Sequence, residues 1–527
     1  MADIIIRNGR VVDGTGNPWF RGDIAITNGT IQAIGKISET ANTVIDAENR
    51  IVCPGFIDMH AHPDLTIFYK ETQDYKLRQG ITTEVGGNCG FTAAPLNPRT
   101  SDGLKKYTSF ITPPSGVTWD WVTFEDYLSA VDKSNPSTNM APLLGQGTVR
   151  IAVLGFDQRH PNSQELSEMK SLVEEAMQAG AFGLSTGLVY VPGAYCETEE
   201  IVALAQVASQ YGGIYATHMR NEGDQLIDSI EESITIGQKA NIPVQISHHK
   251  AMGKANHGRV TESLDLIQRT RDQGLDITVD QYPYSASSTT LQAVLPPWSQ
   301  EGGVDAIVKR LSEPESRTRI KLETVRPSGE TRMGGMIEEI LITEVKTQNN
   351  KKVIGHTIKE IGDMRNQEPI EVVLDLLVEE ECGVGMVNFS MADSDIGTVM
   401  AHPVTMIGTD GIYQTGNPHP RVYGTYPRIL GRYVREQQLM EIETAIRKMT
   451  SFPAQKLGIN NKGILRVGAD ADIVIFDPDT VIDTGTYQNS HKYPKGIDYV
   501  LVNGQISVSE GQFTGVTSGK VIRKHNQ

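Results

Sequence analysis

The two ends of the chain alternate short apolar runs with Asn-Gly turns, a pattern typical of antiparallel strands. Near the N-terminus, Asn8-Gly9 and Asn28-Gly29 separate apolar runs at residues 3–6, 23–26, 31–34 and 43–46. Asn-Gly between β-rich runs is a strong hairpin signal. Similar runs return at residues 471–476 and 499–503, and the second ends at Asn503-Gly504. The matching ends predict one sheet module built from both ends of the chain, residues 1–54 and 462–527.

Between these ends, apolar strands alternate with amphipathic helices. The helix expected at residues 162–179 carries its apolar residues on one stripe and stops at Gly180. Further helices are expected at residues 198–210, 225–240 and 260–273. The strand candidates lie at residues 55–59, 81–85, 140–144, 183–185, 214–216, 244–246, 277–279 and 405–408. Eight strands that alternate with helices predict an α/β fold, a TIM-like (β/α)8 barrel over residues 55–461.

One long segment interrupts this alternation. Residues 295–357, between the seventh and eighth strand candidates, are charged and only weakly periodic. Unstructured connections longer than about 15 residues are uncommon in compact domains. We therefore expect an inserted subdomain or lid at this position.

Composition and charge favour some classes of binding partner over others. The chain has 527 residues, of which 39% are hydrophobic and 21% charged, and its net charge is -16. Such an acidic chain disfavours nucleic acid or an anionic membrane surface and favours a small molecule. No apolar run is long enough for a membrane-spanning helix and no secretory signal is visible, so the expected location is the cytoplasm. The oligomeric state stays open.

Histidines and an aspartate stand where several of the apolar runs stop. His60 and His62 follow the first strand of the expected barrel, His218 and His248 end later strands, and Asp410 ends the last. The carboxyl ends of the strands in such a barrel surround one active-site mouth, so these side chains should share a centre.

Cys89 lies in the sequence GGNCG just after the second of these strands, and its glycines allow a sharp turn. Taken singly, a histidine at a strand end or a lone cysteine is more often a structural residue. Their joint occurrence at the ends of five strands favours a metal site. Imidazole, thiolate and carboxylate are together the ligands that Zn²⁺ accepts.

Several motifs resemble a known family. The run PGFIDMHAHPD, the SHHK motif, the late TD and the closing GILRVGADADIVIFDPDTVIDT resemble the amidohydrolase superfamily. GGNCG, THMRNEG, SHHKAMG and YPYSASST are similar, more narrowly, to its N-acyl-D-amino-acid deacylase (D-aminoacylase) branch. The resemblance extends from Ile4 to Val502, apart from the insertion. It implies a zinc-dependent barrel with a β-sandwich formed by both termini.

The resemblance also implies roles for individual residues. Cys89, His218 and His248 resemble the ligands of a tight zinc site, and His60 and His62 resemble the pair that lines a second, weaker site. Asp410 resembles the catalytic carboxylate. It would act as general base and acid beside a metal-bound hydroxide.

The substrate of this branch carries a free carboxylate, which cations at the rim of the site should bind. By resemblance, Lys250 and Arg421 are the candidates, and Tyr282 and Ser288 would add hydroxyl donors. An arginine can bind a carboxylate through two parallel hydrogen bonds.

The sequence departs from the cyclic-amide hydrolases of the same superfamily at one position. Dihydroorotases and hydantoinases place a carboxylated lysine on the fourth strand, where this chain reads FGLSTGL without a lysine. Cys89 would then take the bridging position, which favours hydrolysis of N-acyl-D-amino acids. Another amidohydrolase activity, as in a dipeptidase or a hydantoinase-like enzyme, and a non-catalytic barrel remain alternatives. The number of bound metals also stays open.

Overall fold

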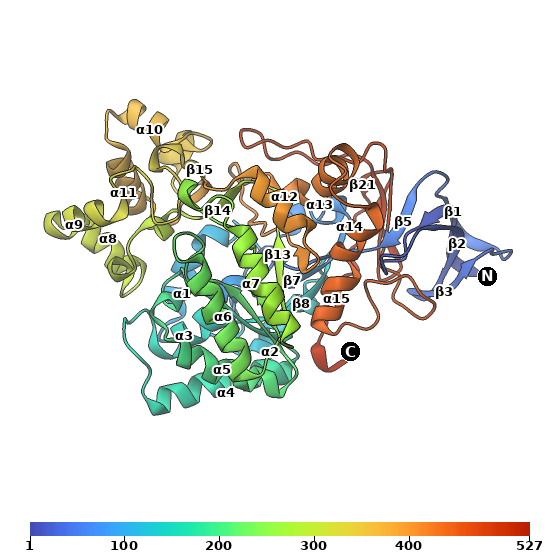
Figure 1. Cartoon of the computed structure of the whole chain (residues 1–527), viewed down its shortest axis with the longest axis horizontal. Coiled ribbons are helices and arrows are strands. Elements are labelled where there is room, and N and C mark those ends of the chain that lie inside the picture. Colours follow the sequence, from blue (N-terminus) through green and yellow to red (C-terminus); the bar gives the residue numbers. More distant parts are fainter. Residues whose placement is uncertain (527) are drawn as a thin grey trace.

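Strands from both ends of the chain form one sheet in the computed structural model, which describes residues 1–526. Strand β18 lies antiparallel to β5, with Ile473 opposite Pro54, and this pairing joins the two ends. Figure 1 shows this sheet at one end of the long axis of the molecule. Its nine strands are β1 (Ala2–Val11), β2 (Phe20–Thr27), β3 (Thr30–Gly35), β4 (Ala41–Asp46), β5 (Ile51–Pro54), β18 (Ile473–Phe476), β19 (Ile497–Val502), β20 (Gln505–Ser509) and β21 (Gln512–Phe513).

The expected Asn-Gly turns have different outcomes. Asn28-Gly29 joins β2 to β3, and Asn503-Gly504 joins β19 to β20, so both of these turns are confirmed. The turn predicted at Asn8-Gly9 is wrong, because β1 continues through it and pairs with β2 on both sides of an irregularity between Ile6 and Gly9. Asn8 has a φ of 62° there. The left-handed residue therefore makes a bulge instead of a hairpin.

Parallel strands occupy the middle of the molecule, and each of the eight strand candidates contains a strand. Two sheets run in the orders β6-β7-β8 and β17-β13-β12-β11-β10-β9. Their bounds are β6 (Phe56–Asp58), β7 (Ile81–Gly86), β8 (Asn139–Pro142), β9 (Leu144–Gly145), β10 (Gly183–Gly187), β11 (Ile214–His218), β12 (Val244–Ile246), β13 (Ile277–Gln281) and β17 (Thr405–Ile407).

Backbone hydrogen bonds connect the two parallel sheets on both sides. The amide of Met59, just after β6, donates to the Ile407 carbonyl of β17 at 3.1 Å. On the other side, the amide of Phe182, just before β10, donates to the Pro142 carbonyl of β8 at 2.7 Å. The candidate at residues 140–144 consists of two short strands, β8 and β9, interrupted at Leu143.

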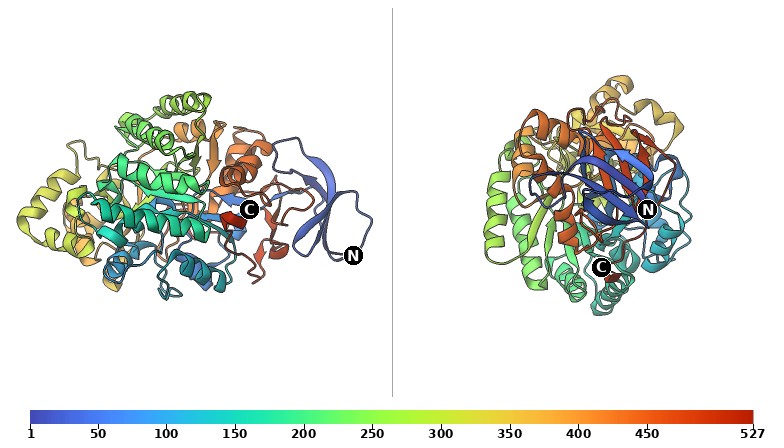
Figure 2. Two further views of the ribbon diagram at one scale, coloured as in Figure 1. Left: turned by 90° about the horizontal axis from the view of Figure 1, so that it is seen from below. Right: turned by 90° about the vertical axis from the view of Figure 1, so that its right-hand side faces the viewer.

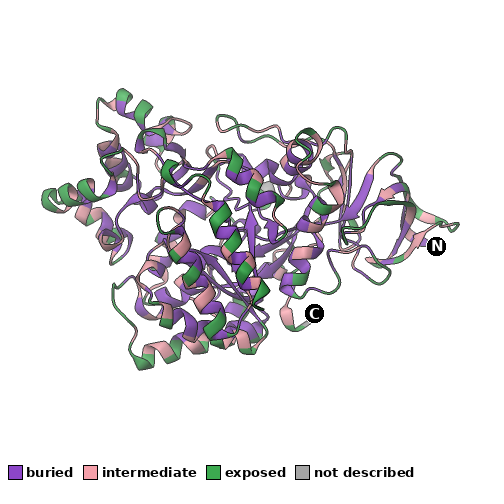
Figure 3. Ribbon diagram, in the orientation of Figure 1, coloured by how far each residue is buried: buried purple, intermediate pink, exposed green. Residues whose placement is uncertain are grey.

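Helices pack outside the parallel strands (Figures 1 and 2), and their outer faces are exposed whereas the strands are buried (Figure 3). The Asn162 side chain caps α4 by accepting from the amides of Gln164 and Glu165, and Gly180 ends it at a φ of 109°. The helices around the strands are α1 (Ser101–Tyr107), α2 (Phe124–Lys133), α3 (Gln146–Leu154), α4 (Ser163–Ala179), α5 (Thr198–Gln210), α6 (Leu226–Ala240), α7 (Val260–Asp272), α12 (Asp393–Ala401), α13 (Arg421–Arg428), α14 (Ile442–Met449) and α15 (Ser451–Leu457). The four helices expected from the sequence are confirmed.

A separate lobe projects between β13 and β17, at the opposite end of the molecule from the terminal sheet (Figure 1). It contains β14 (Ala286–Thr290), α8 (Val304–Ser312), α9 (Pro314–Thr324), β15 (Leu341–Glu344), α10 (Ile358–Arg365), α11 (Pro369–Glu379) and β16 (Gly385–Phe389). One hydrophobic cluster extends within it from Leu291 to Met386. The lobe is longer than the expected residues 295–357. The sequence pattern did not reveal α10 and α11 as part of it, because regular amphipathic helices look like a continuation of the strand–helix alternation.

Among the residues that the structure describes, no helix combines the length and the apolar character needed to cross a membrane.

Gly87 supplies a test of the turn that follows β7. It has a φ of 76°, and a Cβ atom there would lie 2.0 Å from the Leu143 carbonyl oxygen. We expect Gly87→Ala to lower the midpoint of thermal unfolding, because both the left-handed backbone and the close contact penalise a methyl group.

The matched control is Gly274→Ala, since Gly274 has a φ of 104° but open space around the position of its Cβ. Differential scanning fluorimetry should place the midpoint of Gly87→Ala more than about 3 °C below that of Gly274→Ala. Equal midpoints would show that the close contact with Leu143 does not lower the stability of Gly87→Ala.

Candidate metal centre

The Cys89 thiol lies at the centre of a group of buried imidazoles. Gly87, Cys89 and Gly90 all have positive φ angles, and this sharp turn after β7 directs the sulfur inward. The Cys89 Sγ atom lies 3.3 Å from His60 Nε2, 3.5 Å from His248 Nε2 and 3.7 Å from His218 Nδ1. Three imidazoles from three different strand ends therefore face one sulfur.

His62 and Asp410 join the same cluster from the ends of β6 and β17. Asp410 Oδ1 lies 3.1 Å from His62 Nε2 and 3.5 Å from His60 Nε2. Ligand atoms of His60, Cys89, His248 and Asp410 all lie within 4.8 Å of one another. The structure thus brings together all six side chains that the sequence predicts as metal ligands or catalytic base, at the carboxyl ends of the parallel strands.

Burial and charge act in opposite directions on the acidic groups. Burial alone would raise the pKa of Cys89, but the positive charge on His60 and hydrogen bonds from His218 and His248 hold it well below its ordinary value. Burial would likewise raise the pKa of Asp410, but the Arg421 guanidinium and the neighbouring imidazoles hold it well below its usual range. Both side chains are therefore anionic near neutral pH.

These donors fit a zinc ion. Zinc binds thiolate sulfur, imidazole nitrogen and carboxylate oxygen, and the thiolate is the form of cysteine that binds metals. The donor atoms of the centre are of these three kinds, they are buried, and they face one another. Without a cation between them, anionic side chains in a buried cluster depend on protonated imidazoles for compensation.

Glu222 is a residue of the centre that the sequence analysis missed. Its carboxylate lies 3.1 Å from His248 Nδ1 and 3.4 Å from His218 Nε2, on the sides of both rings that face away from Cys89. One carboxylate thus contacts the outer nitrogens of two predicted ligands. Carboxylates in this position fix the tautomer and orientation of metal-binding histidines. The available signal was its place in THMRNEG, four residues after His218.

Asp280, on β13, was missed as well. Its Oδ1 atom lies 3.3 Å from His60 Nδ1 and accepts a 2.7 Å hydrogen bond from the backbone amide of His248. Its Oδ2 atom accepts from Gln245 at 2.8 Å. Asp280 therefore orients the His60 ring and holds the turn that carries His248.

The predicted substrate-binding residues line the same centre, but both cations are paired within the chain. The Lys250 ammonium lies 2.7 Å from Glu222, and an Arg421 Nη atom lies 2.9 Å from Asp410 Oδ2. The Arg421 guanidinium also covers the Tyr282 ring and donates to the Ser288 backbone carbonyl. Ser288 thus contributes its carbonyl here, and the Tyr282 hydroxyl is buried without a partner among the described residues. Their roles toward a substrate stay predictions.

Comparison with known proteins identifies the group to which this arrangement belongs. Residues 43–508 match the amidohydrolase family. The chain belongs to that family. It is 36% identical to a D-aminoacylase of Alcaligenes xylosoxydans xylosoxydans, over 99% of this chain and 98% of the relative.

Solved structures agree with this assignment to the D-aminoacylase branch. An N-acyl-D-glutamate deacylase from Bordetella bronchiseptica, complexed with zinc and a phosphonate that mimics the tetrahedral intermediate, superposes with a TM-score of 0.84. The two are 33% identical, and the match covers 99% of each chain. A D-aminoacylase with a binuclear metal centre, described as activated by one metal and attenuated by a second, matches with a TM-score of 0.83 at 34% identity, over 99% of this chain and all of the other. The mixed α/β fold is therefore that of the D-aminoacylases.

Glu222→Gln tests how the centre is built. The amide keeps the size of the side chain but removes the charge that faces His218 and His248, so we expect zinc affinity to fall about 10- to 100-fold. Competition with a zinc-binding dye measures this affinity without any substrate.

Glu232→Gln is the control, because Glu232 pairs with Arg220 and contacts neither histidine in the structure. It should bind zinc as tightly as the unmodified protein. If Glu222→Gln binds zinc equally well, Glu222 does not support the metal ligands.

Proposed function

We propose that this chain is a zinc-dependent hydrolase that cleaves the amide bond of N-acyl-D-amino acids and releases a carboxylate and a free D-amino acid. The observation that carries the proposal is the convergence of three imidazole nitrogens on the Cys89 sulfur beside Asp410. The D-aminoacylase and the zinc-bound deacylase described above, similar over nearly the whole chain, support the same reaction.

The proposed architecture follows the connections between the strands. We infer that the two parallel sheets, joined by hydrogen bonds on both sides, form the closed (β/α)8 barrel expected from the sequence. In this arrangement residues 55–461 form the catalytic domain with its inserted lobe, and residues 1–54 and 462–527 form the small β domain. The cytoplasmic location stays a prediction from the sequence.

Five side chains are proposed to hold metal. Cys89, His218 and His248 form the tight zinc site, and His60 and His62 line a second, weaker position next to it. When bound there, zinc supplies Lewis acidity, which polarises an amide carbonyl and makes a water molecule more acidic. Glu222 and Asp280 keep the imidazole nitrogens turned toward this position.

Asp410 is proposed to move the proton. Its carboxylate is ionised, and contacts with Arg421 and His62 fix both of its oxygens. It can therefore accept a proton from the attacking water and deliver it to the nitrogen of the leaving amine. Without this transfer the amine would have to leave as an amide anion, which is a very poor leaving group.

Lys250, Arg421, Tyr282 and Ser288 are proposed to bind the carboxylate of the substrate. The Tyr282 hydroxyl supports this role, because a buried donor without a partner costs free energy that an incoming acceptor would recover. The two cations lie near the Tyr282 ring, with the Lys250 Nζ atom 5.7 Å and the Arg421 Cζ atom 4.5 Å from its centroid. A carboxylate beside Tyr282 would therefore meet both positive charges.

A substrate panel tests the reaction. We expect the zinc-loaded protein to release free amine from N-acetyl-D-methionine, N-acetyl-D-leucine or N-acetyl-D-glutamate, with a kcat/KM at least about 100-fold above that for the L enantiomers. Removal of zinc by a chelator should abolish the activity, and added zinc should restore it. The proposal is contradicted if none of the D substrates releases amine, or if hydantoin or dihydroorotate is hydrolysed faster than all of them.

Asp410→Asn tests the proton transfer. Because the amide cannot accept the proton, kcat should fall at least about 100-fold while the zinc content measured by atomic absorption stays unchanged. Asp393→Asn, at an exposed position of α12, is the control and should keep full activity. A parallel loss of zinc and rate in Asp410→Asn would instead identify Asp410 as chiefly a metal ligand.

A further inference from the structure

Three buried polar side chains meet beside the metal centre, and none of the roles proposed above uses them. Asp58 ends β6, Lys76 lies in the segment between β6 and β7, and Thr409 lies between β17 and Asp410. The exposed fractions of Asp58 and Thr409 are 0%, and that of Lys76 is 2%. The Lys76 ammonium lies 2.6 Å from Asp58 Oδ2 and donates to the Thr409 hydroxyl oxygen at 2.8 Å.

The Asp58 carboxylate binds Thr409 through both of its oxygens. Its Oδ1 atom accepts from the Thr409 backbone amide at 2.7 Å, and its Oδ2 atom accepts from the Thr409 hydroxyl at 2.6 Å. Hydrogen bonds to an ionised acceptor are shorter and stronger than those between neutral groups. The residue that precedes Asp410 is therefore fixed to the end of β6.

Thr409 begins the turn that carries Asp410. Asp410 has a φ of 48°, a left-handed conformation that a residue with a side chain adopts only where its surroundings impose it. The Asp410 amide donates to the His60 carbonyl at 2.7 Å, and the Gly411 amide donates to the Thr409 hydroxyl oxygen at 3.0 Å. Three consecutive amides of the turn are thus bound, two of them by the side chains of Asp58 and Thr409.

Lys76 compensates the buried charge of Asp58, since a carboxylate in the interior is costly without a cation beside it. Lys76 also lies 3.2 Å from Glu84 Oε2 on β7, and Glu84 Oε1 accepts from the Thr138 hydroxyl at 2.8 Å. Among the described residues no hydrogen bond joins Glu84 to Thr409. The two carboxylates share one lysine, but only Asp58 binds the turn.

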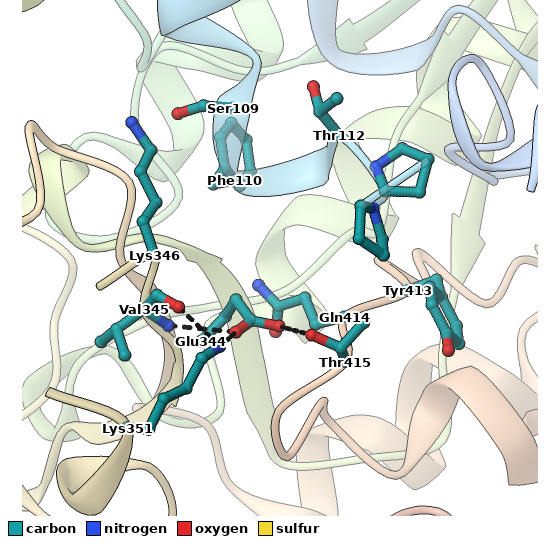
Figure 4. A pocket seen from close by; sticks show the side chains of 12 residues that line it. Ser109, Phe110, Thr112, Glu344, Val345, Lys346, Lys351, Tyr413, Gln414 and Thr415 are labelled. Carbon is teal, nitrogen blue, oxygen red and sulfur yellow. Dashed lines mark hydrogen bonds and ion pairs between the residues drawn. The ribbon is translucent and has the colours of Figure 1, made fainter. Parts of the chain in front are cut away.

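The segment that follows the turn has a separate anchor on the inserted lobe. The Thr415 hydroxyl and the Gly416 amide each donate to Glu344 Oε2 at 2.9 Å. Figure 4 shows the contact between Thr415 and Glu344 beside a cavity of about 270 Å³. Because four residues separate Thr415 from Asp410, this anchor does not fix the Asp410 backbone directly.

We propose that Asp58 and Thr409 are positioning residues for the proton transfer by Asp410, with Lys76 compensating the charge of Asp58. Asp58 binds Thr409, and Thr409 holds the left-handed turn that directs the Asp410 carboxylate toward the metal centre. The inference rests on the proposed hydrolysis and assigns these side chains to it. Position matters for such a group, because a displacement of about 1 Å can lower a rate about 100-fold.

Asp58→Asn and Glu84→Gln are a matched pair of variants. Each removes one negative charge beside Lys76 and keeps the size of the side chain, but only Asp58→Asn weakens the binding of Thr409. With zinc-loaded protein and the best N-acetyl-D-amino acid, kcat should fall about tenfold in Asp58→Asn while KM stays within about twofold. Glu84→Gln should keep the kcat of the unmodified protein. Equal kcat values in the two variants, lowered or not, overturn the inference.

Thr409→Val is the second test, since it removes the hydroxyl and nearly keeps the shape of the side chain. We expect a fall in kcat of about tenfold at unchanged KM, and recovery to within about twofold in Thr409→Ser, which restores the hydroxyl. Thr415→Val is the control, because it removes the hydroxyl of the separate anchor. A rate in Thr409→Ser as low as in Thr409→Val would contradict a role of the hydroxyl.

Hydrogen exchange of the Asp410 amide tests the inference without turnover and without zinc. Its acceptor, the His60 carbonyl, is present in every variant, so faster exchange reports a looser turn. Mass spectrometry with fragmentation to single residues should find exchange about tenfold faster in Asp58→Asn and Thr409→Val, and unchanged in the two control variants.

The exchange rates also separate failure of the inference from failure of the proposed function. An unchanged rate in Asp58→Asn and Thr409→Val overturns the inference, whether or not any substrate is hydrolysed. If the unmodified protein hydrolyses none of the D substrates, the proposed function fails, and faster exchange then supports only the hold of Asp58 and Thr409 on the turn.

Discussion

The contact between one thiolate and three imidazoles holds the proposed active site together. Cys89 is buried, so its negative charge requires compensation nearby. His60, His218 and His248 supply it from three separate strand ends, and a zinc ion would supply it more completely. The other features of the centre serve this contact: the left-handed turn of residues 87–90 directs the sulfur inward, and Glu222 and Asp280 turn the rings toward it.

The parallel strands explain why residues far apart in the chain meet. Their carboxyl ends share one edge, so each strand delivers one or two side chains to the same place and the helices outside fix the spacing. His60 and Asp410 are 350 positions apart, yet the Asp410 amide donates to the His60 carbonyl at 2.7 Å. The same edge borders the inserted lobe, which adds a wall that the strands alone do not provide.

Strand ends were the part of the site that sequence patterns could reveal. His218 and His248 each end an apolar run, and Cys89 stands between glycines, so their approach follows from the periodicity of the chain. Asp280 directly follows the apolar run at residues 277–279, so it carried the same signal as Asp410 but was not recognised. Glu222 lies outside the strands, where a carboxylate reads as an ordinary polar residue until its partners are known. The pairing of Arg421 with Asp410 was hidden for the same reason.

The fold shows a similar division. Regular helices with clear caps, such as α4, were placed within one or two residues. Asn8-Gly9 misled because a left-handed residue serves a bulge as well as a hairpin, and only the pairing of β1 with β2 distinguishes them. The inserted lobe was predicted too short, because α10 and α11 have the same amphipathic pattern as helices packed on a parallel sheet.

The coordination of zinc by Cys89 is the central claim, and X-ray absorption at the zinc edge tests it most directly. The purified protein loaded with one zinc per chain should show one sulfur at about 2.3 Å together with nitrogen or oxygen neighbours at about 2.0–2.1 Å. The sulfur signal should vanish in Cys89→Ser. A shell of nitrogen and oxygen alone in the unmodified protein would contradict the account.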